Sequence, residues 1–397
     1  QSAGARFSCV PKMEHEEEEP DFSALGPAFE VDPDPLGLGA FGSVHLATMS
    51  LGGALGRKVM CVKAISKQRT REQAEAGGAT TPWQELLQRE VDITAELGRT
   101  QHRHMPRFYG TADDGTYVLL ALQLCGGGEL PQWLLAREEP YSERLAARLV
   151  YECLQAVRCC HDLGIVHRDI KPQNLLFGSP SDDARLKLVD FGLATRHTAG
   201  DDPLSELCGT VDYMAPEMLR GAYDERVDVW AVSPHTSLLP PRLPFLLLRG
   251  SSQLFTASSR HRGQVGVLLA VLLLGRHPFR GPSATATEER ILKGDWDKEA
   301  WEASGISAGA VDLLRSLLSP RAATRPSAKL ALRHPWLKSR SLSADEAPPL
   351  DPDIPRSLHA MCEAENWAAG SGESFDPRSS RSTEPPPSPG REKAMTP

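Results

Sequence analysis

Three short motifs between residues 167 and 217 determine how the rest of this chain is interpreted. In chain order they are His167-Arg168-Asp169-Ile170-Lys171-Pro172-Gln173-Asn174, Asp190-Phe191-Gly192 and Ala215-Pro216-Glu217. Apolar runs at residues 175–177 and 186–189 separate the first two motifs, and both runs are typical of short buried strands. A single acidic or basic residue on a loop would mean little, so the prediction depends on the whole ordered set.

The residue types in these motifs suit phosphoryl transfer. That reaction needs a carboxylate for the proton of the incoming hydroxyl, oxygen ligands for Mg²⁺, and cations near the transferring charge. We expect Asp169 to be the base and Lys171 the nearby cation. We expect Asn174 and Asp190 to hold the metal.

A glycine-rich stretch lies upstream: Leu36-Gly37-Leu38-Gly39-Ala40-Phe41-Gly42-Ser43-Val44. Such a pattern alone is weak, because it can also open a dinucleotide-binding fold. Here no acidic residue follows a second strand at the required place, and residues 59–63 instead resemble a strand that ends in Lys63. The stretch therefore predicts a hairpin whose backbone covers phosphates, with Lys63 holding the α- and β-phosphates.

A helix after residue 82 is expected to carry the carboxylate that orients Lys63. Residues 81–84 look like a capping box with Pro82 at the first helical position. Apolar residues then recur at helical spacing: Trp83, Leu86, Leu87, Val91 and Leu97. Glu90 lies on this helix and is our candidate partner for Lys63. Residues 69–80 are expected to form a loop.

The motifs together resemble those of the eukaryotic protein kinases, closest to the calcium/calmodulin-dependent group, over roughly residues 31–337. The placement of Lys171 two residues after Asp169 is typical of Ser/Thr rather than Tyr kinases. Three distal features support the resemblance: Asp228-Val229-Trp230 as the start of the large-lobe helix, Arg325 as the partner of Glu217, and the closing motif His334-Pro335-Trp336-Leu337. The resemblance implies an α+β fold, with a small β-rich lobe, a large helical lobe and ATP between them.

The resemblance also implies a set of site residues. Leu122 would be the gatekeeper, within a buried strand expected at residues 117–124. The backbone of Gln123 and Cys125 would meet adenine, and Glu129 would reach the ribose or a basic substrate residue. The expected catalytic residues are Asp169, Lys171, Lys63 and Glu90, with Asn174 and Asp190 as Mg²⁺ ligands. The expected ATP site comprises Leu36, Gly37, Leu38, Gly39, Ala40, Phe41, Gly42, Val44, Cys61, Lys63, Leu122, Gln123, Cys125, Glu129 and Leu176.

Residues 232–264 depart from the family pattern. They contain four prolines, four arginines and no Asp, Glu or Lys, and they interrupt what should be a buried helix that resumes at residue 265. A retained intron is the favoured explanation, and a natural insertion is the alternative. If the segment is real and disrupts the large lobe, the chain would be a pseudokinase scaffold rather than an enzyme.

The activation segment and the choice of substrate also depart from the family. Glu206 stands where relatives carry a phosphorylatable threonine, so we expect its carboxylate to pair with Arg168 and order the segment without phosphate. Gln173 replaces an acid of basophilic relatives. Protein substrates with one upstream arginine, recognised by Glu129, are therefore expected rather than strongly multi-basic ones.

Both ends of the chain have compositions typical of disorder. Residues 1–28 form an acidic leader with Glu16-Glu17-Glu18-Glu19, and residues 338–397 form a Pro/Ser-rich tail. Within the tail, residues 353–367 predict a short regulatory helix with Ile354, Leu358, Met361 and Trp367 on one face. No EF-hand loop follows, so a calcium sensor acting in trans is the candidate regulatory partner.

The bulk properties exclude several classes of protein. The net charge of −8 argues against general affinity for nucleic acid. The longest apolar run, residues 267–274, is too short to span a bilayer. No secretory signal is visible, and the eight cysteines include no CxxC. We therefore expect reduced thiols and a cytoplasmic location, with the nucleus as an alternative.

Overall fold

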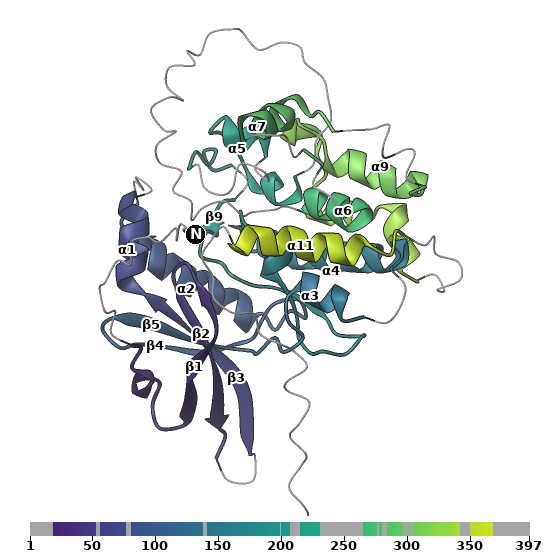
Figure 1. The fold of residues 1–397 in the computed structure, drawn as a ribbon. Helices are drawn as coiled ribbons and strands as arrows, with labels where there is room; N and C mark the ends of the chain where they lie inside the picture. Colours follow the sequence, from purple (N-terminus) through teal and green to yellow (C-terminus); the bar gives the residue numbers. More distant parts are fainter. Residues whose placement is uncertain are drawn as a thin grey trace, which may run out of the picture.

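The chain forms two lobes in a computed structural model (Figure 1). The structure describes residues 19–52, 56–76, 81–137, 141–198, 200–206, 215–230, 265–275, 278–279, 284–296, 301, 305–341 and 350–367. A five-stranded sheet with two helices makes the small lobe, and helices dominate the large lobe. This arrangement confirms the predicted α+β, two-lobed fold.

The small lobe is built on one antiparallel sheet with strand order β1-β2-β3-β5-β4. Its strands are β1 (Phe29–Gly39), β2 (Gly42–Ser50), β3 (Arg57–Ser66), β4 (Phe108–Asp113) and β5 (Tyr117–Leu122). The predicted glycine-rich hairpin is the β1–β2 connection, with its turn at Ala40 and Phe41. A Cβ on Gly42 would lie 1.8 Å from the Ala64 carbonyl oxygen, so this close approach of β2 to β3 requires glycine.

Two helices follow β3, and the first corrects the sequence analysis. Helix α1 (Lys67–Ala76) occupies most of the stretch predicted as a loop. Its residues are strong helix formers joined by the i,i+4 pairs Gln68–Glu72 and Arg71–Glu75, but the segment carries almost no apolar periodicity. The prediction relied on periodicity and on the Gly-Gly at 77–78, and it therefore missed a polar helix that ends just before those glycines.

Helix α2 (Trp83–Arg99) carries Glu90, as predicted. The predicted cap is wrong in detail. Pro82 is the N-cap residue, with an extended backbone (ψ 140°), and no side chain makes a capping hydrogen bond. The apolar face of α2 is buried, including Leu87, Val91 and Leu97.

The large lobe is organised around α4 (Glu143–His161), whose apolar face of Leu145, Leu149, Cys153 and Val157 is buried. Ser142 is its N-cap residue, although its side chain makes no capping bond. The remaining elements, with η for 3₁₀ helices, are η1 (Phe22–Leu25, in the small lobe), α3 (Leu130–Leu135), β6 (Ile165–Val166), η3 (Pro172–Asn174), β7 (Leu175–Phe177), β8 (Leu186–Leu188), β9 (Thr195–Arg196), α5 (Pro216–Leu219), η5 (Glu225–Val229), α6 (Val265–Leu274), α7 (Ala284–Lys293), α9 (Ala308–Leu317), η7 (Ala322–Thr324), α10 (Ala328–Ala331), η8 (Pro335–Ser341) and α11 (Ile354–Trp367).

The helix predicted to begin at Asp228 is instead the 3₁₀ helix η5, which ends at Val229. Trp230 has an extended backbone (ψ 134°), so the chain leaves the helical direction before residue 231. The predicted resumption at residue 265 is confirmed by α6, whose residues 267–273 are buried against α4 and α9. Residues 232–264 and the acidic leader up to residue 18 lie outside the described part of the chain.

Helix α11 confirms the helix predicted in the tail. It packs against α3 and α6 (Figure 1), and Ile354, Leu358 and Met361 are buried there. Gly275, with φ of +64°, lies so close that a Cβ would be 3.1 Å from the Ser357 Cβ. The Trp367 side chain lies outside the described residues. The described part of α11 is therefore a packed component of the large lobe.

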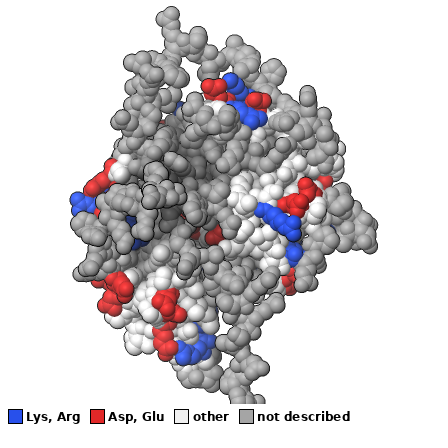
Figure 2. All heavy atoms as spheres, in the orientation of Figure 1, with Lys and Arg blue, Asp and Glu red and all other residues white. Residues whose placement is uncertain are grey.

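The charged surface and the helix lengths can be described for the same residues. On the face shown in Figure 2, charged side chains of the described residues lie in small groups, several of which contain both acidic and basic residues. None of the helices in the described ranges is both long and apolar enough to cross a bilayer.

Candidate active site

Lys63, Glu90 and Asp190 meet where β3, α2 and the segment after β8 converge. The Lys63 Nζ lies 2.7 Å from Glu90 Oε1 and 2.9 Å from Asp190 Oδ1. Burial alone would lower the pKa of Lys63, but the Asp190 and Glu90 carboxylates outweigh it and hold that pKa above its usual value. Burial would raise the pKa of Asp190, but Lys63, with help from Lys171, holds it well below its usual range. Both groups are therefore charged at neutral pH.

The catalytic-loop motif places Asp169 within a hydrogen-bonded group. The Asn174 side-chain amide donates to Asp169 Oδ2 at 2.9 Å and to the Asp169 backbone carbonyl at 2.9 Å. The Lys171 Nζ lies 3.4 Å from Asp169 Oδ2. The carboxylate, the cation and the amide predicted from the motif are thus brought together on one loop.

Two residues beside these groups have unusual backbone conformations. Arg168 has φ of +65° and Asp190 has φ of +63°, a region that costs free energy for residues other than glycine. Both conformations are held by neighbouring contacts. The Arg168 N–H donates to Asp228 Oδ1 at 2.8 Å, and Phe191 packs edge-on against His167 at 5.1 Å.

Asp228 anchors the catalytic loop. Its fully buried carboxylate accepts hydrogen bonds from the backbone N–H groups of His167 and Arg168, both at 2.8 Å. It also pairs with the His161 Nε2 at 2.9 Å. Sequence reasoning did not single out His161, because it stands at the end of α4 outside any motif.

The residues predicted to contact adenine lie at the crossing between the lobes. Leu122 of β5 lies opposite Cys61 of β3 in the strand register. The Gln123 N–H already donates to the Arg107 carbonyl at 2.9 Å. The backbone group of Gln123 that could bind a ligand is therefore its carbonyl. The thiols of Cys61 and Cys125 both lie 3.8 Å from that carbonyl. Burial raises the pKa of Cys61 to about 12 and that of Cys125 to about 11, so both are neutral thiols.

The other predicted ATP-site residues lie around the same region. Val44 pairs with Lys63 across β2 and β3, and Leu176 forms an isolated β-bridge with Glu129. The side chain of Leu38, in the glycine-rich strand, is exposed. Of the predicted residues, Leu36, Gly37, Leu38 and Gly39 lie in β1, Ala40 and Phe41 form the turn, and Gly42 begins β2.

The activation segment is linked to the catalytic loop through Arg168. The Arg168 Nη1 lies 2.9 Å from Glu206 Oε2, which confirms the predicted contact. Tyr223 joins this group, because its hydroxyl donates to the Glu206 carbonyl at 2.6 Å and accepts from the Arg168 guanidinium at 3.0 Å. The sequence carried no signal for Tyr223. Residues 207–214, which include Cys208-Gly209-Thr210, lie outside the described residues.

The predicted pair of Glu217 and Arg325 is present and deeply buried. Two guanidinium nitrogens of Arg325 lie 2.5 and 3.1 Å from the two carboxylate oxygens of Glu217. The guanidinium also stacks 4.8 Å from the ring centre of Trp230. This bidentate pair fixes the Ala215-Pro216-Glu217 motif to the end of the large lobe.

Comparisons with known proteins agree with this geometry. A family model described as the protein kinase domain matches residues 31–245. The chain is 33% identical to calcium-dependent protein kinase 4 of Arabidopsis thaliana over 323 residues, which is 80% of this chain and 54% of that protein. It is 34% identical to calcium-dependent protein kinase SK5 of Glycine max over 318 residues, covering 80% of this chain and 52% of that protein.

The chain thus spans about half the length of these curated relatives. The family match ends within residues 232–264, so the domain boundary at residue 337 remains a prediction. The family model covers more than half of the chain, and the catalytic motifs lie together in the structure. This chain belongs to the protein kinase family, and its kinase domain is of the serine/threonine type related to the calcium-dependent protein kinases.

Proposed function

We propose that this chain transfers the γ-phosphate of ATP to serine and threonine hydroxyls of proteins, with Mg²⁺. The observation that carries the proposal is the convergence of five charged and amide side chains. The Lys63–Glu90 and Lys63–Asp190 pairs and the Asn174–Asp169 hydrogen bond all have lengths below 3.0 Å. Their presence in one site favours an enzyme over the pseudokinase scaffold.

The donor set fits the ligands that the reaction requires. Mg²⁺ is usually held by one or two carboxylates or amides together with substrate phosphates, rather than by an all-protein cage. Asp190 and Asn174 provide such oxygen atoms, and the described residues contain no cluster of three or more His, Cys, Asp or Glu suited to another metal. When bound, Mg²⁺ would neutralise phosphate charge.

Each side chain then has a distinct part in the mechanism. Asp169 accepts the proton of the substrate hydroxyl, while Asn174 keeps its carboxylate oriented. Lys171 adds positive charge close to that carboxylate. Lys63 binds phosphate oxygens and is held in place by Glu90. The glycine-rich β1–β2 hairpin supplies backbone N–H groups over the phosphates.

Control by Glu206 yields the first prediction. Because its carboxylate already pairs with Arg168, the enzyme produced in bacteria and treated with phosphatase should be active. Glu206→Ala should lower kcat/KM about tenfold, since the buried Arg168 loses a charged hydrogen-bond partner. Steady-state kinetics on a serine peptide measure this change.

Glu206→Thr supplies the matched control. It should restore activity only after an upstream kinase has phosphorylated the new threonine. Loss of wild-type activity on phosphatase treatment would show that a phosphorylated residue, and not Glu206, orders the segment.

Glu129 yields a pH-dependent prediction. Burial raises its pKa to about 7, with Lys171 opposing the shift. The carboxylate is thus mostly neutral at pH 6 and mostly charged at pH 8, and only the charged form attracts a substrate arginine. KM for a peptide with one upstream arginine should therefore fall by up to about tenfold from pH 6 to pH 8.

Two controls isolate the Glu129 carboxylate. Glu129→Gln removes the titrating group, and a peptide with alanine in place of the arginine removes its partner. Both should give a nearly flat KM across this pH range. An equal slope for the two peptides would contradict the assignment to Glu129.

Two further proposals concern partners. The substrates are proteins, and a calcium-sensor protein acting in trans is the proposed regulator, because the matched relatives are named calcium-dependent kinases. Adding such a sensor with and without Ca²⁺ to the purified chain tests this point. Activity that is unchanged by Ca²⁺ in the presence of the sensor would exclude that regulation.

The test of the proposed function is the transfer of phosphate to a serine peptide, followed by mass spectrometry. We expect a mass increase of one phosphate in the presence of ATP and Mg²⁺ and none without ATP. A chain that binds ATP but never modifies peptide or protein would refute the proposal.

A further inference from the structure

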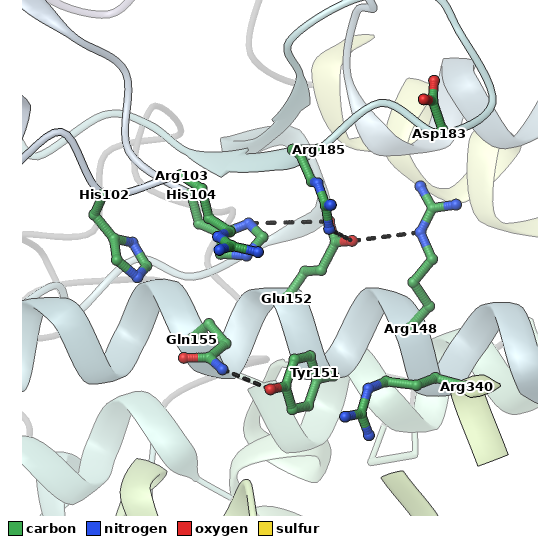
Figure 3. A pocket seen from close by; sticks show the side chains of 10 residues that line it. All are labelled: His102, Arg103, His104, Arg148, Tyr151, Glu152, Gln155, Asp183, Arg185 and Arg340. Carbon is green, nitrogen blue, oxygen red and sulfur yellow. Dashed lines mark hydrogen bonds and ion pairs between the residues drawn. The ribbon is translucent and has the colours of Figure 1, made fainter. Parts of the chain in front are cut away.

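A polar hollow of about 590 Å³ lies away from the catalytic residues, between α4, the loop before β4 and the connection of β7 to β8 (Figure 3). Its volume falls within the range of ligand-binding sites, roughly 300–1,000 Å³. Every residue that lines it is polar or charged, apart from the ring of Tyr151. This lining suits a polar, charged ligand, because no aliphatic residue is among those that line it.

Cations outnumber anions around the hollow. Four arginines line it, namely Arg103, Arg148, Arg185 and Arg340, against two carboxylates. One of these carboxylates, Glu152, is buried and shared, lying 3.4 Å from the Arg148 guanidinium and 3.8 Å from the Arg185 guanidinium. The lining therefore carries a net positive charge near +2 when its histidines are neutral.

The four arginines differ in the contacts that they already make within the protein. The Arg148 guanidinium donates to the carbonyls of residues 182 and 184, at 2.9 and 2.8 Å, and is part of the wall. Arg340 stacks on Tyr151 at 3.9 Å. Arg185 is 58% exposed, and Arg103 is exposed without an ion pair to any described residue. Arg185 makes only a long 3.8 Å ion pair to Glu152, so Arg103 and Arg185 are the two guanidinium groups most open to a ligand.

Burial and nearby positive charges lower the pKa values of the two histidines in the hollow. Burial lowers the pKa of His102, and the nearby Arg103, Lys187 and Arg158 lower it further. Burial likewise lowers the pKa of His104 to about 4, which keeps that ring neutral. An anion bound between the exposed arginines would relieve this repulsion.

The chain's own acidic leader is a poor fit for this position. It is anchored at Asp21, whose N–H donates to Asp114 at the far end of β4. The six residues of β4 span about 20 Å, and the hollow lies beyond their other end. Glu19 can extend only about 7 Å from Asp21, and even Glu14 only about 25 Å. Most of the leader's glutamates cannot reach the hollow.

We propose that this hollow is a docking site for an acidic segment of the kinase's protein substrates, in which clustered carboxylates bind Arg103 and Arg185. Guanidinium groups match carboxylate geometry through paired hydrogen bonds. Docking of such a segment raises the effective concentration of a phosphoacceptor elsewhere on the same substrate. The effect of docking on KM rests on the proposed kinase function, whereas the binding of an acidic segment to the hollow does not.

Binding is tested first, with fluorescein-labelled hexaglutamate and fluorescence polarisation. Arg103→Ala/Arg185→Ala should weaken binding at least tenfold relative to wild type. The matched control is Arg71→Ala/Lys293→Ala, which removes two exposed positive charges on α1 and α7 and should change the Kd less than twofold. Hexaglutamine should not bind. Equal affinity of the two double variants would refute the docking site.

The kinetic arm uses a serine peptide with and without hexaglutamate attached through a flexible linker of about 20 residues. The attached segment should lower KM about tenfold in the wild type and leave kcat unchanged. The Arg103→Ala/Arg185→Ala variant should lose this difference while keeping the KM of the short peptide. Phosphate transfer without hexaglutamate binding would refute only the docking site, and binding without any transfer would refute only the proposed kinase function.

Two other occupants would overturn the proposal. Tighter binding of phosphatidylserine vesicles to wild type than to the Arg103→Ala/Arg185→Ala variant, without hexaglutamate binding, would assign the hollow to membranes. Hexaglutamate binding that emerges only after deletion of residues 1–19 would assign it to the leader.

Discussion

Asp169→Asn is expected to lower kcat by about 10²- to 10⁴-fold, the usual contribution of a positioned general base. Asparagine has nearly the same shape as aspartate but cannot accept the substrate proton. It also removes the negative charge that Lys171 faces at 3.4 Å and replaces an oxygen that accepts from Asn174. Steady-state kinetics with a serine peptide measure the loss.

The fold and the binding of ATP should survive this change. The substitution leaves the backbone hydrogen bonds of residue 169 in place. The contacts among Lys63, Glu90 and Asp190 do not involve Asp169 and should also remain. Thermal melting and ATP titration of the variant are the controls, and both should match wild type closely. A variant with near-normal turnover would show that Asp169 is not the base.

Arg325→Met should lower the free energy of unfolding by about 3–5 kcal/mol, because it leaves the Glu217 carboxylate buried without a counter-charge. The Arg325 side chain is fully buried and donates to Glu217, to the Arg226 carbonyl and to the Ser319 carbonyl. Its loss also removes the contact with Trp230. Urea unfolding monitored by tryptophan fluorescence measures the difference.

Two companion variants separate charge from packing. Arg325→Met/Glu217→Leu removes both charges, and much of the lost stability should return. Arg71→Met replaces an exposed arginine of α1 and should change stability by less than about 0.5 kcal/mol. If Arg325→Met unfolds at the same urea concentration as Arg71→Met, the buried pair is not a stabilising element of the lobe.

Motif order predicts the catalytic centre of this chain well. Lys63 and Glu90 are 27 positions apart, yet they were paired correctly. The reason is that the chemistry of each motif position requires a particular residue type. The helix and strand patterns then indicate where that residue lies in the fold. The contact of Glu206 with Arg168 was predicted in the same way. The ion pair between Lys63 and Asp190, which are 127 positions apart, was not predicted.

Features without periodicity or motif chemistry were missed. Helix α1 is held by propensity and charge pairs rather than by an apolar face, so periodicity gave no signal. Tyr223 and His161 support the site through side-chain hydrogen bonds to Glu206, Arg168 and Asp228, and such contacts depend on tertiary packing. The sequence also did not predict that η5 is a 3₁₀ helix, because Asp228-Val229-Trp230 has the composition of a helix start.

The most direct test of the account follows radiolabel from [γ-³²P]ATP to a serine- and threonine-containing protein, with wild type and Asp190→Asn in parallel. Wild type with Mg²⁺ should label serine or threonine, and excess EDTA should abolish the labelling. Asp190→Asn should transfer almost none, because it lacks the carboxylate expected to hold Mg²⁺ and paired with Lys63. Equal labelling by wild type and Asp190→Asn, or wild-type labelling that persists in EDTA, would contradict the assigned chemistry.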